Sequence, residues 1–219
     1  MDLPGFGDSP PDGSASVEDF TARLQAFFDE QELERPHVAG NSLGGGIGFE
    51  LARRGAARSL TAFSPIGLWS LGERRRGSAA FRLGRALGER TPKRISPRLL
   101  ANLSRPSLFV FAFGHPWRVP DKEILETAMR GRQAPGFEAA LPAVNSYTLQ
   151  RPQELREVPT TIAWGSRDVL IPAWSNPRRA RQALPWARHV SLRGCGHVPF
   201  FDDPGACARV LLEGSADRG

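Results

Sequence analysis

Short apolar runs alternate with amphipathic segments along much of the chain. Four runs have the length and composition of buried strands, and they lie at 37–39, 59–64, 160–164 and 189–192. Strands that alternate with helices are typical of a parallel sheet, because each return to the sheet needs a crossover connection that covers one of its faces. The pattern therefore predicts an α/β fold with a mostly parallel sheet flanked by helices.

Helical signals stand between these runs. Ser16 is a candidate N-cap, and an acidic first turn and an apolar stripe follow it to about Glu34. A second helix should follow the first strand and run to about Arg54, where Gly55 closes it. We expect two more near 175–184 and 204–212.

The alternation stops between residues 65 and 152. This stretch has helix-like segments and no strand that leads into a turn and a helix, with the segments near 78–87, 97–103, 122–130 and 137–149. We therefore predict a helical insertion at 65–152, and one α/β domain made of 1–64 and 153–219. The sequence has no internal repeat.

Length and composition fit a globular protein. A chain of 219 residues with 40% hydrophobic residues can bury one sizeable core. No run is apolar enough to span a bilayer, and the start of the chain lacks the basic and apolar regions of a signal peptide. The sequence therefore predicts a cytoplasmic protein with no membrane association.

The net charge of +6 raises the possibility of a nucleic-acid partner. The arginines are scattered, however, apart from the clusters at 74–76 and 178–179, and no nucleic-acid-binding motif accompanies them. We therefore expect no nucleic-acid partner. Two cysteines, Cys195 and Cys207, make neither a disulfide framework nor a zinc site, and we expect no metal and no cofactor.

The chemistry of the chain centres on the glycine-rich turn after the first apolar run. The turn reads Gly40-Asn41-Ser42-Leu43-Gly44-Gly45, with a helical segment after it. A turn of this kind strains its central residue, and its glycines allow the strand and helix to approach closely. The serine is then exposed beside a helix N-terminus, where backbone N–H groups stabilise an anion, as acyl transfer requires.

Three other interpretations of this turn compete with that of a nucleophile. A Gly-x-Ser-x-Gly pentapeptide is often only a glycine-rich turn, although the strand before it and the helix after it favour a nucleophile. The turn is no phosphate-binding loop, because Gly46 and Ile47 follow Gly45 where that motif needs a lysine. The glycine spacing also fails the dinucleotide-binding fingerprint.

A base and a carboxylate follow two other predicted strands. Asp168 comes after the strand 160–164, and His197 comes after the strand 189–192. The carboxyl ends of parallel strands share one edge of the sheet, so we expect both residues near Ser42. A serine needs such a base, and the base needs a third group to orient it.

Four motifs together carry a resemblance to a known family. They are Asp2-x-x-Gly5-x-Gly7-x-Ser9, Gly40-Asn41-Ser42-Leu43-Gly44-Gly45, Gly165-Ser166-Arg167-Asp168, and Gly196-His197 ahead of Pro199. With the chain order serine, aspartate, histidine, the sequence resembles the serine-nucleophile α/β-hydrolase superfamily. The motifs extend from the first residues to the last predicted helix.

The resemblance implies a role for each of these residues. Ser42 would be the nucleophile, His197 the general base and acid, and Asp168 the carboxylate that orients the histidine. The backbone N–H of Leu43 would be one oxyanion donor. The insertion at 65–152 would be the family's helical cap, which shapes the pocket for a small-molecule substrate.

The expected activity is that of a serine hydrolase acting on a carboxylic ester or a related carbonyl compound. The Gly40-Asn41-Ser42 turn is also similar to that of hydrolases that cleave carbon–carbon bonds in vinylogous diketones. Epoxide hydrolases and haloalkane dehalogenases resemble this fold but have aspartate in place of Ser42. An inactive fragment is a further alternative, and the sequence leaves the substrate and the oligomeric state open.

Several residues compete for these roles. Asp202 and Asp203 follow His197 too closely for the usual acid, and we expect them to begin or cap the last helix. We expect structural roles for the other histidines and for Cys195, a small residue in a tight turn. The aromatic residues of the insertion could line a pocket or form its core, and they are Phe109, Phe111, Phe113, Trp117 and Tyr147.

The sequence departs from the family at its start. Members of the family have several strands before the loop at 2–9, and one of those strands leads to the second oxyanion donor. None precedes the loop in the sequence given, so we expect an incomplete domain with a sheet of about four strands. The strand at 37–39 would then be an edge strand, and solubility or activity would be low.

Overall fold

The structure is a computed structural model, and it describes residues 2–90, 111–124, 126 and 135–216. The helix predicted near 97–103 lies outside the described residues, as does most of the one predicted near 122–130.

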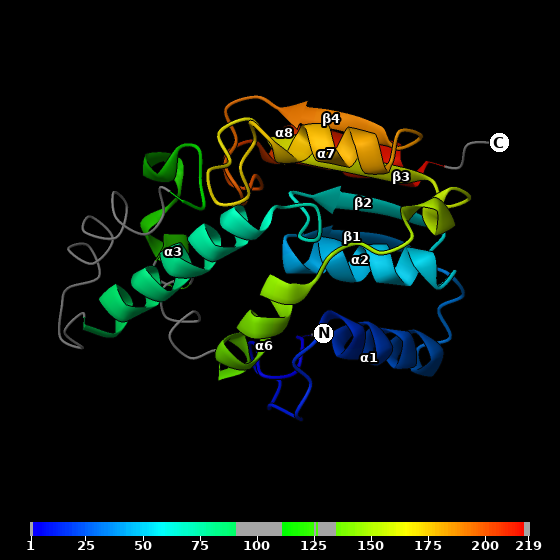
Figure 1. Ribbon diagram of the computed structural model, residues 1–219, viewed down its shortest axis with the longest axis horizontal. Coiled ribbons are helices and arrows are strands. Elements are labelled where there is room, and N and C mark those ends of the chain that lie inside the picture. The colour runs from blue at the N-terminus through cyan, green and yellow to red at the C-terminus, as the bar shows by residue number, and fades with distance from the viewer. Residues whose placement is uncertain (1, 91–110, 125, 127–134, 217–219) are drawn as a thin grey trace.

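The described chain is built on a parallel sheet of four strands (Figure 1). Its strands are β1 (His37–Asn41), β2 (Ser59–Phe63), β3 (Thr160–Gly165) and β4 (Arg188–Leu192). They lie in the order β1-β2-β3-β4, and each neighbouring pair is parallel. The predicted α/β fold with a parallel sheet flanked by helices is confirmed, and all carboxyl ends of the strands share one edge.

The predicted helices of the α/β part form close to their expected places. They are α1 (Val17–Glu30), α2 (Leu43–Arg53), α7 (Asn176–Ala183) and α8 (Pro204–Ser215). Ser16 caps α1 in a capping box with Asp19. The helix ends four residues earlier than predicted, and Glu32 just beyond it takes a positive φ of 54°, which cannot continue a right-handed helix.

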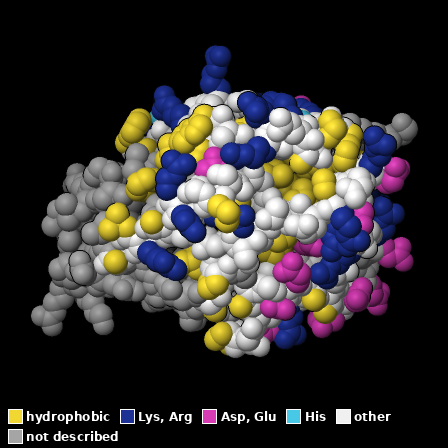
Figure 2. Space-filling model, in the orientation of Figure 1, with side chains coloured by type: hydrophobic (Ala, Val, Ile, Leu, Met, Phe, Trp, Pro, Cys, Tyr) yellow, Lys and Arg dark blue, Asp and Glu magenta, His cyan; other side chains and the backbone are white. Residues whose placement is uncertain are grey.

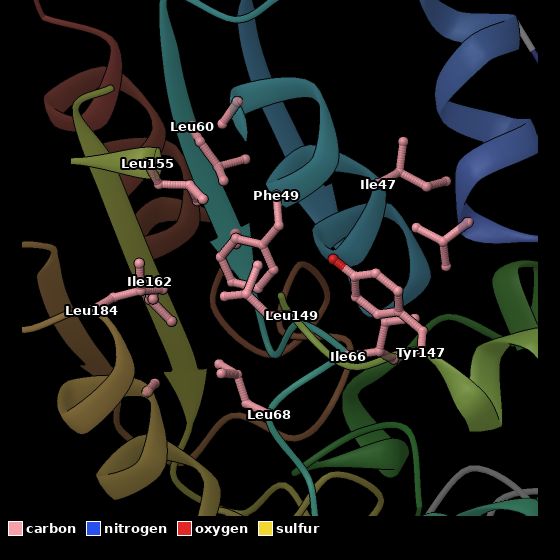
Figure 3. Packing of buried hydrophobic residues seen from close by; sticks show 14 of the residues in the cluster. Ile47, Phe49, Leu60, Ile66, Leu68, Tyr147, Leu149, Leu155, Ile162 and Leu184 are labelled. Carbon is pink, nitrogen blue, oxygen red and sulfur yellow. The ribbon is translucent and has the colours of Figure 1, made fainter. Parts of the chain in front are cut away.

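The two faces of the sheet bury separate hydrophobic clusters. Leu60 and Ile162 point to the face covered by α1, α2 and α7, where they pack with Phe49 and Leu184 (Figure 3). Side chains alternate along β2, so Phe63 points to the opposite face. There it belongs to a second cluster, which α8 covers. Both faces of β2 and β3 are therefore buried, as expected of central strands in a parallel sheet.

β1 forms one edge of the described sheet. It pairs only with β2 among the described strands, and none of its residues is fully buried. The expected edge position of this strand is confirmed.

Between β2 and β3 the described residues contain helices and no strand. α3 (Leu71–Arg90) and α6 (Pro135–Ser146) pack against each other and extend away from the sheet (Figure 1). Two short 3₁₀ helices occupy Pro116–Arg118 and Pro152–Leu155. Glu73 of α3 accepts hydrogen bonds from Ser175 and from Arg179 of α7, which attach α3 to the α/β part.

The aromatic residues of this insertion have several roles. Tyr147 packs in the main core (Figure 3). Its hydroxyl donates a 3.0 Å hydrogen bond to buried Glu50 of α2. Burial raises the pKa of Tyr147, and the charge of Glu50 adds to that effect, so the phenol stays protonated. Phe113 belongs to a small separate cluster, whereas Trp117 is 66% exposed. Phe109 lies outside the described residues.

Candidate active site

Ser42 lies at the tip of the turn between β1 and α2 in a strained conformation. Its φ is 55° and its ψ is −112°, a combination that a residue with a side chain rarely adopts. Three backbone hydrogen bonds fix it: its N–H donates to the carbonyl of Phe63, and its own carbonyl accepts from the N–H groups of Gly46 and Ile66. The predicted strained turn is therefore present.

Close backbone packing explains two of the glycines in the turn. A Cβ on Gly40 would lie 2.2 Å from the carbonyl oxygen of Gly44, and one on Gly45 would lie 2.7 Å from the Cβ of Pro65. A Cβ on Gly44 would meet no atom within 4 Å. The sequence prediction treated all three alike, and it was wrong for Gly44, where the space is open.

The N-terminus of α2 lies directly after the serine. Leu43 is the first residue of the helix, so its N–H has no acceptor within the helix. The positive end of the helix dipole adds to the attraction for an anion at this place. This geometry suits an oxyanion donor at Leu43.

Asp168 and His197 form a buried pair at the same edge of the sheet. Asp168 follows β3 and is 1% exposed, His197 follows β4 and is 3% exposed, and Oδ2 of the aspartate lies 2.9 Å from Nδ1 of the histidine. Oδ1 accepts hydrogen bonds from the N–H groups of Leu170 and Ile171. Because a carboxylate can only accept, this contact requires a proton on Nδ1 of His197, and in the neutral ring the lone pair is then on Nε2.

The serine and histidine segments are joined through Asn41. Its Nδ2 donates to the carbonyls of Phe63 and His197, with both distances at 3.0 Å. Among the hydrogen bonds of the described residues, none joins the Ser42 hydroxyl to the His197 ring. Such bonds often form only when substrate is bound. The structure thus brings Asp168 and His197 into contact and places Ser42 in the segment beside them.

The loop that carries His197 is held on its other side by Asp202. Oδ2 of Asp202 accepts from the N–H groups of Gly196 and Gly114, and Oδ1 accepts from the N–H of His115, each at 2.8 Å. The expectation that Asp202 caps the last helix was wrong. Asp203 alone caps α8, through the N–H of Ala206. A helix needs only one N-cap residue. The presence of two consecutive acids was therefore the sequence signal that one of them has another role.

Glycines allow the loops around His197 to come together. A Cβ on Gly165 would lie 2.1 Å from the carbonyl oxygen of Gly196, and one on Gly114 would lie 2.0 Å from that of Gly194. The N–H of Val198 also donates a 2.7 Å bond to the carbonyl of Ala112. Backbone from the insertion therefore packs directly against the histidine loop.

The remaining candidates have structural partners. His37 Nδ1 lies 2.8 Å from Ser59 Oγ, and His189 Nε2 lies 2.9 Å from the carbonyl of Leu184. Burial lowers the pKa of His189, which favours its neutral form. Burial raises the pKa of Cys195 to about 12, so this thiol is a poor nucleophile.

The described residues offer neither a cluster of metal ligands nor a helix that could cross a membrane. They contain no group of three or more histidine, cysteine, aspartate or glutamate side chains placed to hold a metal ion. No helix in this part of the chain combines the length and the apolar character needed to cross a membrane. Figure 2 shows Lys and Arg side chains spread over the face in view.

Comparison with known proteins gives consistent matches. Residues 1–210 match the alpha/beta hydrolase family. The epoxide hydrolase EphH of Mycobacterium tuberculosis is 30% identical over 86% of this chain and 89% of its own length. Among solved structures, a thermophilic esterase from Thermogutta terrifontis has a TM-score of 0.71 and 21% identity, over 97% of this chain and 76% of that one. MGS-M2, an alpha/beta hydrolase enzyme from a deep-sea metagenome library, has a TM-score of 0.76 and 14% identity, over 100% of this chain and 79% of that one.

Proposed function

The chain belongs to the alpha/beta hydrolase family, and from that membership we propose that it is a serine hydrolase that cleaves a carboxylic ester or a related carbonyl substrate. The observation that carries the proposal is the buried 2.9 Å pair of Asp168 and His197, at the sheet edge where Ser42 lies on its strained turn. A hydroxyl, a base and an orienting carboxylate are the parts that acyl transfer needs.

The proposed reaction has two halves. Nε2 of His197 accepts the proton of the Ser42 hydroxyl as Oγ attacks the substrate carbonyl carbon, and the resulting oxyanion is bound by the N–H of Leu43. His197 then gives the proton to the leaving alcohol as the ester bond breaks. Water, deprotonated by His197, then attacks the acyl carbon. As the bond from that carbon to Oγ of Ser42 breaks, His197 returns the proton to Oγ and the acid is released. Asp168 stabilises the imidazolium in both halves.

The serine itself argues against epoxide hydrolysis, the activity in the name of the relative EphH. An epoxide opened by a carboxylate gives an ester, which water can hydrolyse to free the enzyme. An epoxide opened by Ser42 would give an ether, and water does not cleave an ether near neutral pH. A carbonyl substrate avoids this difficulty, because it leaves an acyl ester on the serine.

We also propose that the insertion at 65–152 acts as a cap over the site. Leu141 and Val144 of α6, with Trp69 before α3, line the same cavity as Ser42. The substrate pocket would then lie between the insertion and the edge of the sheet, as is common for ligand sites in α/β proteins.

The test is the loss of the Ser42 hydroxyl. Ser42→Ala should lower ester turnover by at least about 10³-fold, because no other group can form the acyl intermediate. The variant should fold normally, since the serine is only partly buried. A p-nitrophenyl ester assay measures turnover, and a fluorophosphonate probe followed by mass spectrometry identifies the labelled residue.

Two further variants make the test specific. His197→Ala should abolish labelling although the Ser42 hydroxyl is still present, because the serine then lacks its base. Cys195→Ala should keep both labelling and turnover. An active Ser42→Ala protein, or a probe attached elsewhere, would contradict the proposal. A folded chain that neither reacts with the probe nor hydrolyses esters would indicate an inactive member of the family.

A further inference from the structure

We propose that the substrate carries a small, uncharged, apolar acyl group of about six carbons, an inference that rests on the proposed function. A cavity of about 160 Å³ lies against Ser42 and Leu43. Its described lining contains no charged side chain, and its apolar members include Phe6, Ile66, Trp69, Leu141, Val144 and Leu170. A carboxylate or an ammonium group in this cavity would lose its water without gaining a partner.

The position of the cavity identifies the part of the substrate that it holds. Its wall includes Ser42, which would carry the acyl group, and Leu43, which would bind the acyl oxygen. His197, which would protonate the leaving alcohol, is absent from the described lining. The cavity therefore lies on the acyl side of the ester bond.

Apart from Ser42, the polar side chains in the described wall are Ser78 and Asn145, and the Ser78 hydroxyl and Oδ1 of Asn145 are bonded to the protein. The Ser78 hydroxyl lies 2.8 Å from the carbonyl of Arg74 and 2.5 Å from Oδ1 of Asn145, and the guanidinium of Arg74 donates to the backbone carbonyl of Asn145. The contacts with Asn145 join α3 to α6. Recognition in the cavity is then mainly by shape and apolar contact.

The volume sets the size of the acyl group. An apolar cavity of about 150 Å³ in another protein holds one benzene molecule. Each methylene group that fills such a space improves binding about fourfold. We therefore expect kcat/KM to rise from acetate to hexanoate esters by at least tenfold, and to fall for the decanoate, which the cavity cannot contain.

The experiment is a series of p-nitrophenyl esters at fixed active-site concentration. Fluorophosphonate titration first counts reactive Ser42, so failure of the proposed function appears as absent labelling. Labelled enzyme with an acetate or decanoate optimum, or with equal rates for hexanoate and a monoester of a six-carbon diacid, would overturn the acyl-group inference alone.

Variants of the wall should move the optimum in opposite directions. Leu141→Ala enlarges the cavity and should shift the optimum toward octanoate, whereas Val144→Phe fills it and should shift the optimum toward acetate. Leu212→Ala is the matched control, because Leu212 is 70% exposed on α8 and lies outside the lining. If Leu141→Ala fails to fold, the Val144→Phe series still decides the result, and an unchanged optimum there contradicts the inference.

A separate observation points to Asp202 as a positioning residue for His197. Backbone groups before and after the histidine ring are hydrogen-bonded: Gly196 N–H donates to Asp202, His197 C=O accepts from Asn41, and Val198 N–H donates to the carbonyl of Ala112. Asp202 is the charged partner among these three hydrogen bonds. It also accepts hydrogen bonds from two backbone N–H groups of the insertion. Hydrogen bonds to a charged group are among the stronger ones.

Asp202→Asn tests this role, with Asp203→Asn as the matched control in the next position. Asparagine has nearly the same size as aspartate. Its NH₂ group, however, cannot accept the hydrogen bonds that Gly196 and Gly114 donate to Oδ2. We expect kcat per labelled Ser42 to fall at least tenfold with KM within threefold, because the ring of His197 is displaced. Asp203→Asn should change kcat less than twofold, since asparagine is also a good N-cap.

The two readouts separate positioning from stability. A purely structural role would lower the melting temperature and the number of labelled sites, and it would leave kcat per labelled site and the pH profile of kcat/KM unchanged. That result would overturn the assignment. Restoration of kcat by Asp202→Glu would support the need for a carboxylate at this place.

Discussion

Ser42 and His197 lie at the same edge of the sheet, but different interactions hold them there. The serine turn is fixed mainly by close packing: Gly40 lies against the backbone of Gly44, and Gly45 lies against Pro65. Backbone hydrogen bonds to Phe63 and Ile66 also attach the turn to the end of β2 and the loop after it. The histidine loop is fixed by hydrogen bonds with the side chains of Asp168 and Asn41, which come from two distant segments, and with Asp202 at its own far end.

This difference predicts which substitutions the serine turn and the histidine loop can each tolerate. The serine turn should be sensitive to added volume, because its neighbours are backbone atoms and the ring of Pro65, which cannot move independently. The histidine loop should be sensitive to a change of donor or acceptor at constant volume, because buried polar groups that lose a partner are costly. The predictions below test this contrast, beginning with the largest effect.

Gly40→Ala should have the largest effect. Its Cβ would lie 2.2 Å from the carbonyl oxygen and 2.3 Å from the carbonyl carbon of Gly44, so the start of α2 would have to shift. We expect the free energy of unfolding to fall by more than about 3 kcal/mol, together with nearly all activity. Urea unfolding followed by circular dichroism measures this change. A stable, active variant would show that backbone packing does not position the serine.

Asp168→Asn should abolish most activity without a comparable loss of stability. Oδ1 of asparagine can still accept from Leu170 and Ile171, but its NH₂ group would donate to Nδ1 of His197. The proton would then lie on Nε2, and the histidine could not act as a base. We expect kcat to fall by about 10⁴-fold in a folded protein. A kcat within tenfold of the wild-type value would contradict the assignment of Asp168.

Acid should weaken the polar attachment of α3 to α7. Burial opposes ionisation of Glu73, but hydrogen bonds from Ser175, Ser70 and Arg179 hold its pKa at about 2. This value is below the ordinary 4.5, so the stabilisation is complete above pH 4.5 and is lost as the pH falls toward 2. The full effect is about 3 kcal/mol.

The measurement compares Glu73→Gln with the wild type by urea unfolding at pH 7 and pH 3. The advantage of the wild type should shrink at pH 3, whereas Glu126→Gln, in an exposed pair with Lys122, should change stability by less than about 0.5 kcal/mol at either pH. A gap between wild type and Glu73→Gln that does not change with pH would contradict the role of Glu73.

Gly44→Ala should have the smallest effect. Its Cβ would meet no atom within 4 Å, and alanine favours a helix by up to about 1 kcal/mol over glycine. We expect unchanged or slightly higher stability in the same urea titration. A loss similar to that of Gly40→Ala would mean that the whole turn, and not two positions in it, is closely packed.

Local signals predicted most of the fold. The four strands lie within two residues of their predicted ends, because each apolar run is bounded by charged or turn-forming residues. The start of α3 was placed too late, near residue 78. Three consecutive arginines hide its amphipathic pattern, although Ser70 and Glu73 form a capping box that the sequence displays.

The candidate site was predictable where it depends on motifs and unpredictable where it depends on distant contacts. Ser42, Asp168 and His197 each follow a strand, so topology places them at one edge. Asn41 and His197 are 156 positions apart, and Gly114 and Asp202 are 88 apart. No local pattern reports such contacts, because they form only when the insertion and the last strand have packed.

The chain order of the strands has a consequence for synthesis on the ribosome. β1, α2 and β2 are made close together and can associate early, whereas Leu60 of β2 must wait for Thr160 of β3. Such distant pairing is slow to form, because a long intervening loop must close first. During that interval the growing polypeptide exposes the free side of β2, and this is when we expect its greatest need for chaperones. We expect the strand–turn–helix unit that carries Ser42 to form during this interval. The candidate site becomes complete only when the segment that carries His197 has emerged from the ribosome.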